Sequence, residues 1–500
     1  MLALTGCPAT DRSPTAPSIA VDSPNAARPA VPLRVWFVAD QGDKAYIERQ
    51  WQATSDRPLE LSMLSKDQLL ANTKCDCDLV VFPAYLLGEL AQRQWLIELP
   101  SSLSKPGAST GNDAASPAEE GSTLEAENDA ASALPISWSE QVRFGRKVWG
   151  LSLSATAPVI LCNFDLPNKP SEAASDARAF WAQSIETLST AKGVNKSPSV
   201  ESDPLKQSSE SESATSAASA TSTTSATSTM SVASAASDQD SAHVARQTLG
   251  ERFLLIASSL SRREPRFGLW IDPATLKARL NEPESIEAAR ILLELHQLNA
   301  NPRALLGDDI GAWNALVGGL PNLTIGLPPA SSSEVDKVTS IRASLPPIGA
   351  LPPGQSSSPG RATYGWNSGH GLVVALSSQC RQSSQAVEWT KWLSQESTRQ
   401  LLSKRVMAIK TDSTHAPGSS AWQAQKLSHR ICQQPRLPME PRIPMSLQYR
   451  RALGEQLDLL LRGQISPETA MQAANQAWDA ITAKSPRAEL RLIYEQSLGL

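Results

Sequence analysis

The chain has 500 residues, which is more than one ordinary domain needs, so we expect two or more packed cores. Its 46 basic and 50 acidic residues leave a net charge of −4, which argues against nucleic-acid binding, because that function concentrates Lys and Arg on one face. No stretch approaches the roughly 20 apolar residues that a membrane-spanning helix requires. The 13 Trp, against 5 Tyr and 7 Phe, indicate large flat apolar faces that suit a core or a sugar ring.

The first residues resemble a bacterial lipoprotein signal. Leu4-Thr5-Gly6-Cys7 is typical of a lipobox, in which small residues admit the signal peptidase and the Cys7 thiol carries diacylglycerol. Only six residues precede Cys7, whereas a signal contains a basic region and about 7–15 apolar residues, so this interpretation places the true start upstream. The alternative is a chance match. Because the chain that follows is rich in Pro, Ala, Ser and Asp, we expect 1–32 to be a lipoprotein leader and disordered tether.

Strands and helices alternate after this tether. Residues 33–38 and 59–63 are predicted strands, and 45–53 and 85–97 are predicted amphipathic helices. The continuous apolar run at 78–82 is typical of a parallel strand buried on both faces. This alternation predicts a doubly wound α/β lobe.

Two low-complexity stretches interrupt the pattern. Residues 101–133 and 193–240 contain too few apolar side chains to offset the entropy of ordering, so we expect disordered surface inserts. Between them, 158–163 is a predicted strand, and a helix carries Phe180 and Trp181.

The second half continues as α/β chain. Predicted helices cover 249–260, 285–298 and 384–404, and predicted strands cover 323–327 and 371–376. Two further helices are predicted at 446–461 and 467–481. Gly463 ends the first of these, and Ser466 and Pro467 begin the second as N-cap and first helical residue.

Common catalytic signatures are missing from the sequence. It has no phosphate-binding loop, dinucleotide-binding glycine motif, zinc-protease helix or nucleophile elbow. Its five histidines are scattered, so we expect no metal site, no cofactor and no enzyme activity. A pair of glycosidase carboxylates stays open as an alternative, because the spacing of such a pair is spatial.

Five cysteines remain if Cys7 is acylated, and this odd number rules out complete pairing within the chain. Cys75-Asp76-Cys77 does not have a usual zinc spacing. We expect isolated thiols with at most one bridge among Cys75, Cys77, Cys162, Cys380 and Cys432.

Four stretches together resemble the extracellular solute-binding proteins of ABC importers, in particular the sugar-binding family that includes maltose-binding protein. They are 147–166, 281–289, 371–389 and 463–470, which follow the order and spacing of that family's motifs. The chain departs from the family in its long Ser- and Ala-rich inserts, and in Cys162, where the family often has Tyr.

The resemblance implies an α/β, two-lobed, type II periplasmic-binding-protein-like fold with a hinge between the lobes. We expect lobe I at 33–150 with the insert 101–133, and lobe II at 151–300 with the insert 193–240. The chain would return to lobe I at 301–360 and to lobe II at 361–435. Residues 436–500 would form C-terminal helices.

Ligand-binding residues of such a fold are expected in loops at the carboxyl ends of strands, where aromatic rings stack on sugars and polar groups bind hydroxyls. The candidates are Asp40, Gln41, Tyr85, Trp270, Trp313, Tyr364, Trp366 and Asn367. Each has a structural alternative: a Trp is more often part of a core, and Asp40 could cap the following helix. The tryptophans on helical stripes are assigned to packing: Trp51, Trp181, Trp389, Trp392 and Trp478.

The resemblance implies a monomer in the cell envelope or periplasm that touches the membrane only through its lipid anchor. It would capture a small polar solute, expected to be a carbohydrate, and pass it to ABC permease subunits without covalent chemistry. The alternative is a sensor or interaction protein that uses the same fold outside transport.

Overall fold

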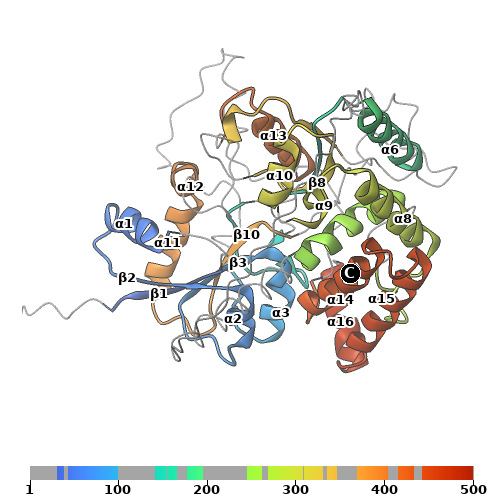
Figure 1. Cartoon of the computed structure of the whole chain (residues 1–500). Helices are drawn as coiled ribbons and strands as arrows, with labels where there is room; N and C mark the ends of the chain where they lie inside the picture. The colour runs from blue at the N-terminus through green and yellow to red at the C-terminus, as the bar shows by residue number, and fades with distance from the viewer. Residues whose placement is uncertain are drawn as a thin grey trace, which may run out of the picture.

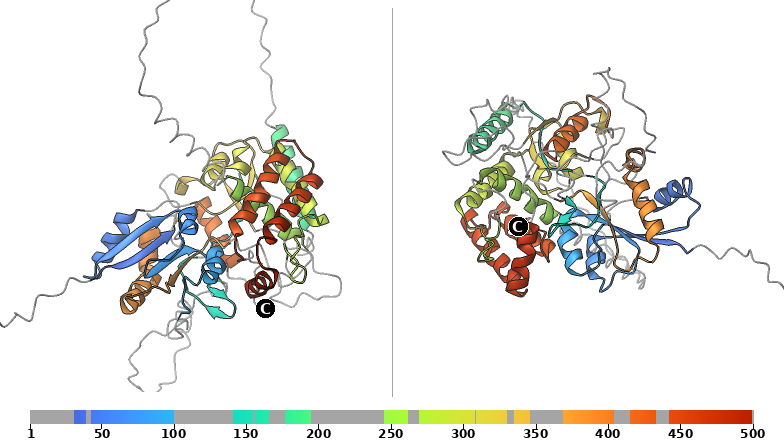
Figure 2. Two further views of the ribbon diagram at one scale, coloured as in Figure 1. Left: turned by 90° about the horizontal axis from the view of Figure 1, so that it is seen from below. Right: turned by 180° about the vertical axis from the view of Figure 1, so that it is seen from behind.

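The computed structural model describes residues 31–38, 43–99, 141–154, 156–165, 177–194, 245–261, 269–307, 309–329, 335–345, 369–403, 415–432 and 442–498. Two separate sheets with helices packed on them, joined by C-terminal helices, make up this part of the chain (Figures 1 and 2). Cys7, nearly all of the tether, the insert 101–133 and nearly all of the insert 193–240 lie outside the described residues.

The first sheet contains five strands in the order β2-β1-β3-β10-β6. β1 pairs in parallel with both β2 and β3, and β10 runs antiparallel to β3 and β6. The strands are β1 (Leu33–Val38), β2 (Leu59–Leu64), β3 (Leu79–Pro83), β6 (Leu151–Ser152) and β10 (Leu372–Leu376). The expected α/β architecture with a buried strand at 78–82 is confirmed.

This sheet is buried on both faces, which explains the continuous apolar run of β3. Val80 and Phe82 face the large central core, whereas Leu79 and Val81 face a second cluster. α1 (Lys44–Gln52), α11 (Ser383–Ser394) and α12 (Glu396–Ser403) build that second cluster with the sheet. Their tryptophans pack there as expected: Trp51 and Trp392 meet edge to face at 5.3 Å, and Trp389 is fully buried.

α2 (Lys66–Ala71), η1 (Ala84–Leu86) and α3 (Leu87–Gln92) belong to the other face, where side chains of each join the central core. A short hairpin of β4 (Arg143–Phe144) and β5 (Lys147–Val148) precedes β6. The predicted helix 85–97 is shorter in the structure and begins as the 3₁₀ turn η1.

The second sheet has three antiparallel strands in the order β8-β7-β9. They are β7 (Val159–Cys162), β8 (Leu323–Gly326) and β9 (Arg342–Ser344). α9 (Arg303–Leu306) and α10 (Asp309–Val317) contact β8, while α13 (Ser420–Cys432) contacts β7, β9 and η4 (Val335–Lys337). Val159 and Leu161 pack toward α10 and α13, and Ile160 faces the central core.

The first sheet with its helices and the second sheet with its helices are called the two halves of the molecule. The C-terminal helices connect them. α14 (Ser446–Leu461) and α15 (Pro467–Thr482) pack on α8 (Pro283–Leu298), which contacts α6 (Ala177–Val194). α16 (Arg487–Ser497) ends the described chain. The Met445 N–H donates to the Glu89 carboxylate of α3 (3.3 Å), and the Leu280 N–H donates to Asn475 of α15 (2.9 Å). The C-terminal helices therefore contact both halves, as Figure 1 shows.

Strand pairing differs from the expected division into lobes. β10 was expected in the second lobe with 361–435, but it pairs with β3 in the first sheet. β8 was expected in the return to the first lobe with 301–360, but it pairs with β7. The reason is that an apolar strand fits either sheet locally, and only pairing between distant segments decides which sheet it joins. α13, at the end of 361–435, packs on the second sheet.

None of the helices in the described ranges is both long enough and apolar enough to cross a membrane.

Candidate functional site

Two aromatic residues meet at the carboxyl end of β3. Tyr85 lies two residues after the end of this strand, and His370 lies two residues before β10, which runs antiparallel and therefore begins at the same edge. The Tyr85 N–H donates to the Gly369 carbonyl (3.1 Å), which extends the strand pairing beyond the sheet. The rings of Tyr85 and His370 lie edge to face with centroids 5.7 Å apart.

Charged side chains from the helical segment 245–260 and from α14 lie at the same place. Glu251, on the helical segment 245–260, accepts a hydrogen bond from His370 Nε2 (2.7 Å) and pairs with Arg450 of α14. The Arg450 guanidinium lies over the Tyr85 ring, with Cζ 4.3 Å from the centroid. We call Tyr85, Glu251, His370 and Arg450 the junction cluster. Its members come from four segments of the chain and connect the first sheet to the rest of the molecule.

Electrostatics hold the Glu251 carboxyl ionised. Burial by itself raises its pKa, but the charges of His370 and Arg450, the hydrogen bond from His370 and the more distant charge of Lys66 outweigh burial and lower the pKa to about 2. The Arg450 side chain is 2% exposed, so its charge depends on this partner and on the Tyr85 ring. The junction cluster thus provides fixed charges and an aromatic face at the edge of a sheet.

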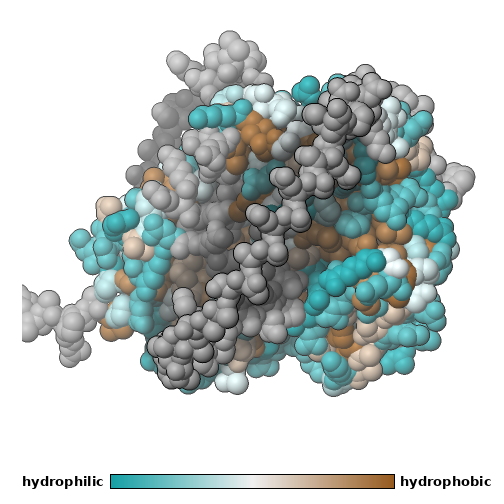
Figure 3. Space-filling model, viewed as in Figure 1, coloured by the Kyte–Doolittle hydropathy of each residue, from teal (hydrophilic) through white to brown (hydrophobic). Residues whose placement is uncertain are grey.

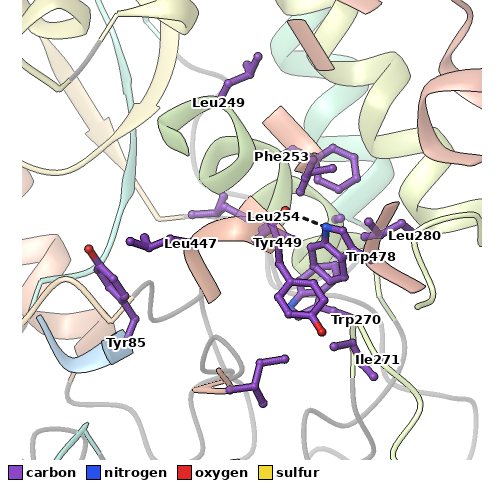
Figure 4. Close-up of a cluster of buried hydrophobic side chains, with 14 of the residues drawn as sticks. Tyr85, Leu249, Phe253, Leu254, Trp270, Ile271, Leu280, Leu447, Tyr449 and Trp478 are labelled. Atoms are coloured by element: carbon purple, nitrogen blue, oxygen red, sulfur yellow. Dashed lines mark hydrogen bonds between the residues drawn. The ribbon is translucent and has the colours of Figure 1, made fainter. Parts of the chain in front are cut away.

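An aromatic cavity of about 20 Å³ adjoins the junction cluster, and the two share Arg450. Its lining includes Trp270, Tyr449 and Trp478 (Figure 4). The Trp478 Nε1–H donates to the Tyr449 carbonyl (2.8 Å), which is the dashed line in Figure 4. Trp270 Nε1 is buried and has no acceptor among the described residues. This volume holds about one water molecule.

A second cavity, of about 150 Å³, lies against Trp270 as well, where Ser261, Glu282, Glu284 and Ser285 line it. Both volumes are below the roughly 300–1,000 Å³ of typical small-molecule sites. The lining residues of both cavities come from 254–285 and from 443–478, so neither cavity contacts the first sheet, and neither holds a sugar-sized solute without rearrangement of these segments.

Figure 3 shows mainly hydrophilic side chains over α14 and α15, with apolar residues gathering toward the middle of the same face.

The structure brings two of the predicted ligand-binding residues into one neighbourhood. Tyr85 contacts Arg450, and Trp270 lines the cavity that Arg450 shares. Figure 4 draws Tyr85 and Trp270 on either side of Leu447. Both predicted residues are buried in this arrangement, and their contact with a ligand stays a prediction.

Trp313 lies elsewhere. It was expected in a glycine-flanked loop, but it belongs to helix α10 and is 2% exposed. Its ring packs with Val159, Leu161 and Ile341 on the face of the second sheet that α10 and α13 cover. This is the position of a packing residue. The remaining candidates lie outside the described residues: Asp40, Gln41, Tyr364, Trp366 and Asn367.

Sequence reasoning did not identify Glu251, His370 or Arg450. His370 carried a usable signal, because it stands just before a predicted strand. Glu251 and Arg450 lie within ordinary amphipathic helices, where a charged residue is usually solvated, so no local pattern marks them.

No protein-family model matches the sequence, and no curated protein sequence matches it. Solved structures do match. The sugar-binding protein MalE from Xanthomonas citri is 11% identical with a TM-score of 0.55, and the match covers 91% of this chain and 98% of that one. Maltose-bound MalE3 of T. maritima is 13% identical with a TM-score of 0.54, over 90% of this chain and 100% of that one. An ABC transporter solute-binding protein from Thermotoga lettingae, bound with α-D-tagatose, is 13% identical with a TM-score of 0.52, covering 90% and 100%.

The fold is that of a type II periplasmic binding protein. The fold class expected from the sequence is thereby confirmed. In folds of this kind ligands bind in a crevice outside the carboxyl ends of sheet strands. The junction cluster, at the carboxyl end of β3, occupies the corresponding edge of the first sheet.

Proposed function

We propose that the protein is a binding protein that captures a small polar solute, a carbohydrate or polyol, for ABC-type uptake. The observation that carries the proposal is a type II binding fold over about nine-tenths of the chain, shared with proteins whose structures hold maltose, α-D-tagatose, ribitol or D-mannitol. No covalent step is required, because a ligand that binds the closed form better than the open form stabilises closure by itself.

The chemistry of the junction supports a sugar-like ligand. The C–H face of a sugar packs on an aromatic ring, which Tyr85 and Trp270 provide. Sugar hydroxyls both donate and accept hydrogen bonds, so they can bind the Glu251 carboxylate and the Arg450 guanidinium. In this proposal the two halves separate to admit the solute and close again over it.

A thermal-shift screen tests the ligand class. The probes are maltose, D-tagatose, ribitol and D-mannitol, with a peptide mixture and divalent metal ions as controls. A probe at 100 times its dissociation constant is expected to stabilise the folded state by about 2.7 kcal/mol. The carbohydrate assignment is wrong if every sugar and polyol leaves the melting temperature unchanged while peptides or metals raise it.

Trp366→Ala tests a predicted contact in the chain before β10. We expect it to weaken solute binding by more than about 1 kcal/mol with little change in melting temperature. The matched control is Trp51→Ala, which opens the packed face of the first sheet and is expected to lower the melting temperature instead. Unchanged affinity in the Trp366 variant, or collapse of its fold, contradicts the assignment.

The proposal includes a lipid anchor at Cys7 and delivery of the solute to ABC permease subunits by a monomeric protein in the cell envelope. Cys7→Ala is expected to release the protein from the membrane fraction. Loss of solute uptake on deletion of the gene supports transport. Intact uptake with a lost signalling response would instead favour the sensor alternative.

A further inference from the structure

Two cysteines lie side by side just before β3. Cys75 Sγ and Cys77 Sγ are 3.3 Å apart, and both side chains are buried. Asp76 between them points outward, where its carboxylate binds Arg34 (2.6 Å). In an extended chain alternate residues point to the same side, so this in-out-in pattern directs both thiols into one space.

The surroundings favour Cys75 as the reactive sulfur. The Ser377 hydroxyl donates to Cys75 Sγ (3.4 Å), and the hydrogen bond from Cys77 lowers the pKa of the Cys75 thiol against the opposing effect of burial. Burial raises the pKa of Cys77, and the nearby charge of Asp78 adds to this. The thiolate is the nucleophile in disulfide exchange. Cys75 keeps 3% of its surface exposed, whereas Cys77 has none, so access and the lowered pKa both favour Cys75 as the attacking group.

We propose that Cys75 and Cys77 form a redox-active dithiol that closes reversibly to an intrachain disulfide by exchange with a disulfide oxidant. The Cys75 thiolate attacks one sulfur of the oxidant, whose S–S bond breaks and releases one thiolate. Cys77 then loses its proton and attacks Cys75 Sγ, so that the mixed disulfide breaks and the second thiol leaves. The dithiol gives up two protons and two electrons, and the oxidant is reduced to two thiols.

Local geometry permits a disulfide between Cys75 and Cys77 and predicts that this disulfide is readily reduced. Residues two apart are separated by at most about 7 Å between Cα atoms, which overlaps the roughly 4.4–6.8 Å that disulfides use. A bond closed across one intervening residue is strained, and strained disulfides are the readily reduced ones. Cys162 and Cys432 are buried in different clusters, and neither has a cysteine partner in the described residues.

This dithiol is independent of the proposed function. It precedes β3, whereas Tyr85 follows β3, so the five-residue strand separates the two by about 17 Å. We therefore expect solute affinity to be the same for the reduced and the oxidised protein. Failure of the sugar screen leaves the dithiol unaffected, and failure of the dithiol leaves the solute site unaffected.

Trypsin mapping of the full chain tests the proposal, with oxidised glutathione as the probe. Cleavage after Lys74 and Arg93 gives a peptide 75–93 that contains both cysteines and no other. After oxidation, acid quenching and alkylation in denaturant, this peptide is expected to be about 2 Da lighter and unalkylated, because two thiol hydrogens are lost. Excess reduced glutathione should restore two alkylated cysteines. The free thiol count of the unfolded protein should fall by two on oxidation.

Three variants provide controls. Cys380→Ser keeps the lighter peptide, because Cys380 lies on the separate tryptic peptide 362–381. Cys75→Ser and Cys77→Ser abolish it. A doubly alkylated peptide in the fully oxidising buffer overturns the proposal, as does a cross-link between 75–93 and 362–381 or a disulfide-linked dimer. The mapping of the unmodified chain decides the question even if a serine variant does not fold.

Discussion

Glu251 shows how one residue can join the two halves of the molecule. One carboxylate oxygen accepts from His370 at the edge of the first sheet, and the other pairs with Arg450 of α14. Its pKa of about 2 in the folded state is below the value near 4.3 of an unfolded chain. The ionised carboxylate therefore stabilises the fold at neutral pH, and this contribution is lost as the pH falls from about 4 toward 2.

Glu251→Gln is expected to lower the free energy of unfolding by about 2 kcal/mol at pH 7, because two charge-assisted contacts are lost. Urea unfolding at several pH values measures the difference, which should shrink as the pH approaches 2. The matched control is Glu287→Gln, whose exposed ion pair with Arg290 (3.3 Å) should contribute less than about 1 kcal/mol. Equal losses in both variants would contradict the role given to the junction cluster.

Gly369 is the residue that lets the chain approach Tyr85 closely. Its φ is +68°, and an added Cβ would lie 3.0 Å from both Tyr85 N and Tyr85 Cβ. Gly319 has a similar φ of +78° but nothing within 4 Å of its Cβ position.

We expect Gly369→Ala to destabilise the protein by about 1 kcal/mol more than Gly319→Ala, since both variants bear the left-handed backbone cost and only the first adds a clash. Chemical denaturation of the two variants gives the comparison. Equal destabilisation would mean that the chain before β10 shifts without cost.

Among the secondary-structure elements, the helix α15 follows its sequence closely. Ser466 was predicted as the N-cap, and its hydroxyl accepts from the Thr469 N–H (3.2 Å) with Pro467 as the first helical residue. Met471, Ala474, Trp478 and Ile481 form the buried face that the sequence indicates.

Ser466→Ala is expected to cost about 1 kcal/mol of stability, because one helical N–H loses its acceptor. Ser394→Ala, near the end of α11, is the control, because the exposed Ser394 hydroxyl caps no helix N-terminus. Thermal and urea unfolding of both variants measure the effect. A larger loss for Ser394→Ala would show that the cap is not what stabilises the start of α15.

Across the whole molecule, one hydrophobic core links the two sheets. It includes Phe82 of β3, Ile160 of β7, Leu292 of α8 and Trp478 of α15. Because the C-terminal helices pack against both halves, we expect the described body to unfold as one cooperative unit.

Trp478→Ala tests this expectation, since its ring packs edge to face on Tyr449 (5.2 Å) in that core. A loss of about 3–5 kcal/mol is expected, with a single calorimetric transition whose calorimetric and van't Hoff enthalpies agree. Two separate transitions in the unmodified chain would show that each half unfolds independently.

Local patterns in the sequence were sufficient to predict most helices and strands of this protein. The apolar run of β3, the helix at 446–461 and the capping residues of α15 are visible without a structure, because strand and helix periodicity act over a few residues. Trp51, Trp389 and Trp392 were assigned to packing for the same reason. The type II fold was implied by the resemblance of four stretches to the motifs of sugar-binding proteins of ABC importers.

Only the tertiary structure decided which segments meet. β10 joins β3 across almost 300 residues of chain, His370 and Glu251 are 119 residues apart, and Glu251 and Arg450 are 199 apart. Trp313, expected in a loop, proved to lie on α10 and pack into the second sheet. Strand pairing, side-chain burial and charge compensation depend on residues that are far apart in the sequence. A local sequence pattern therefore does not identify the distant segment that it contacts.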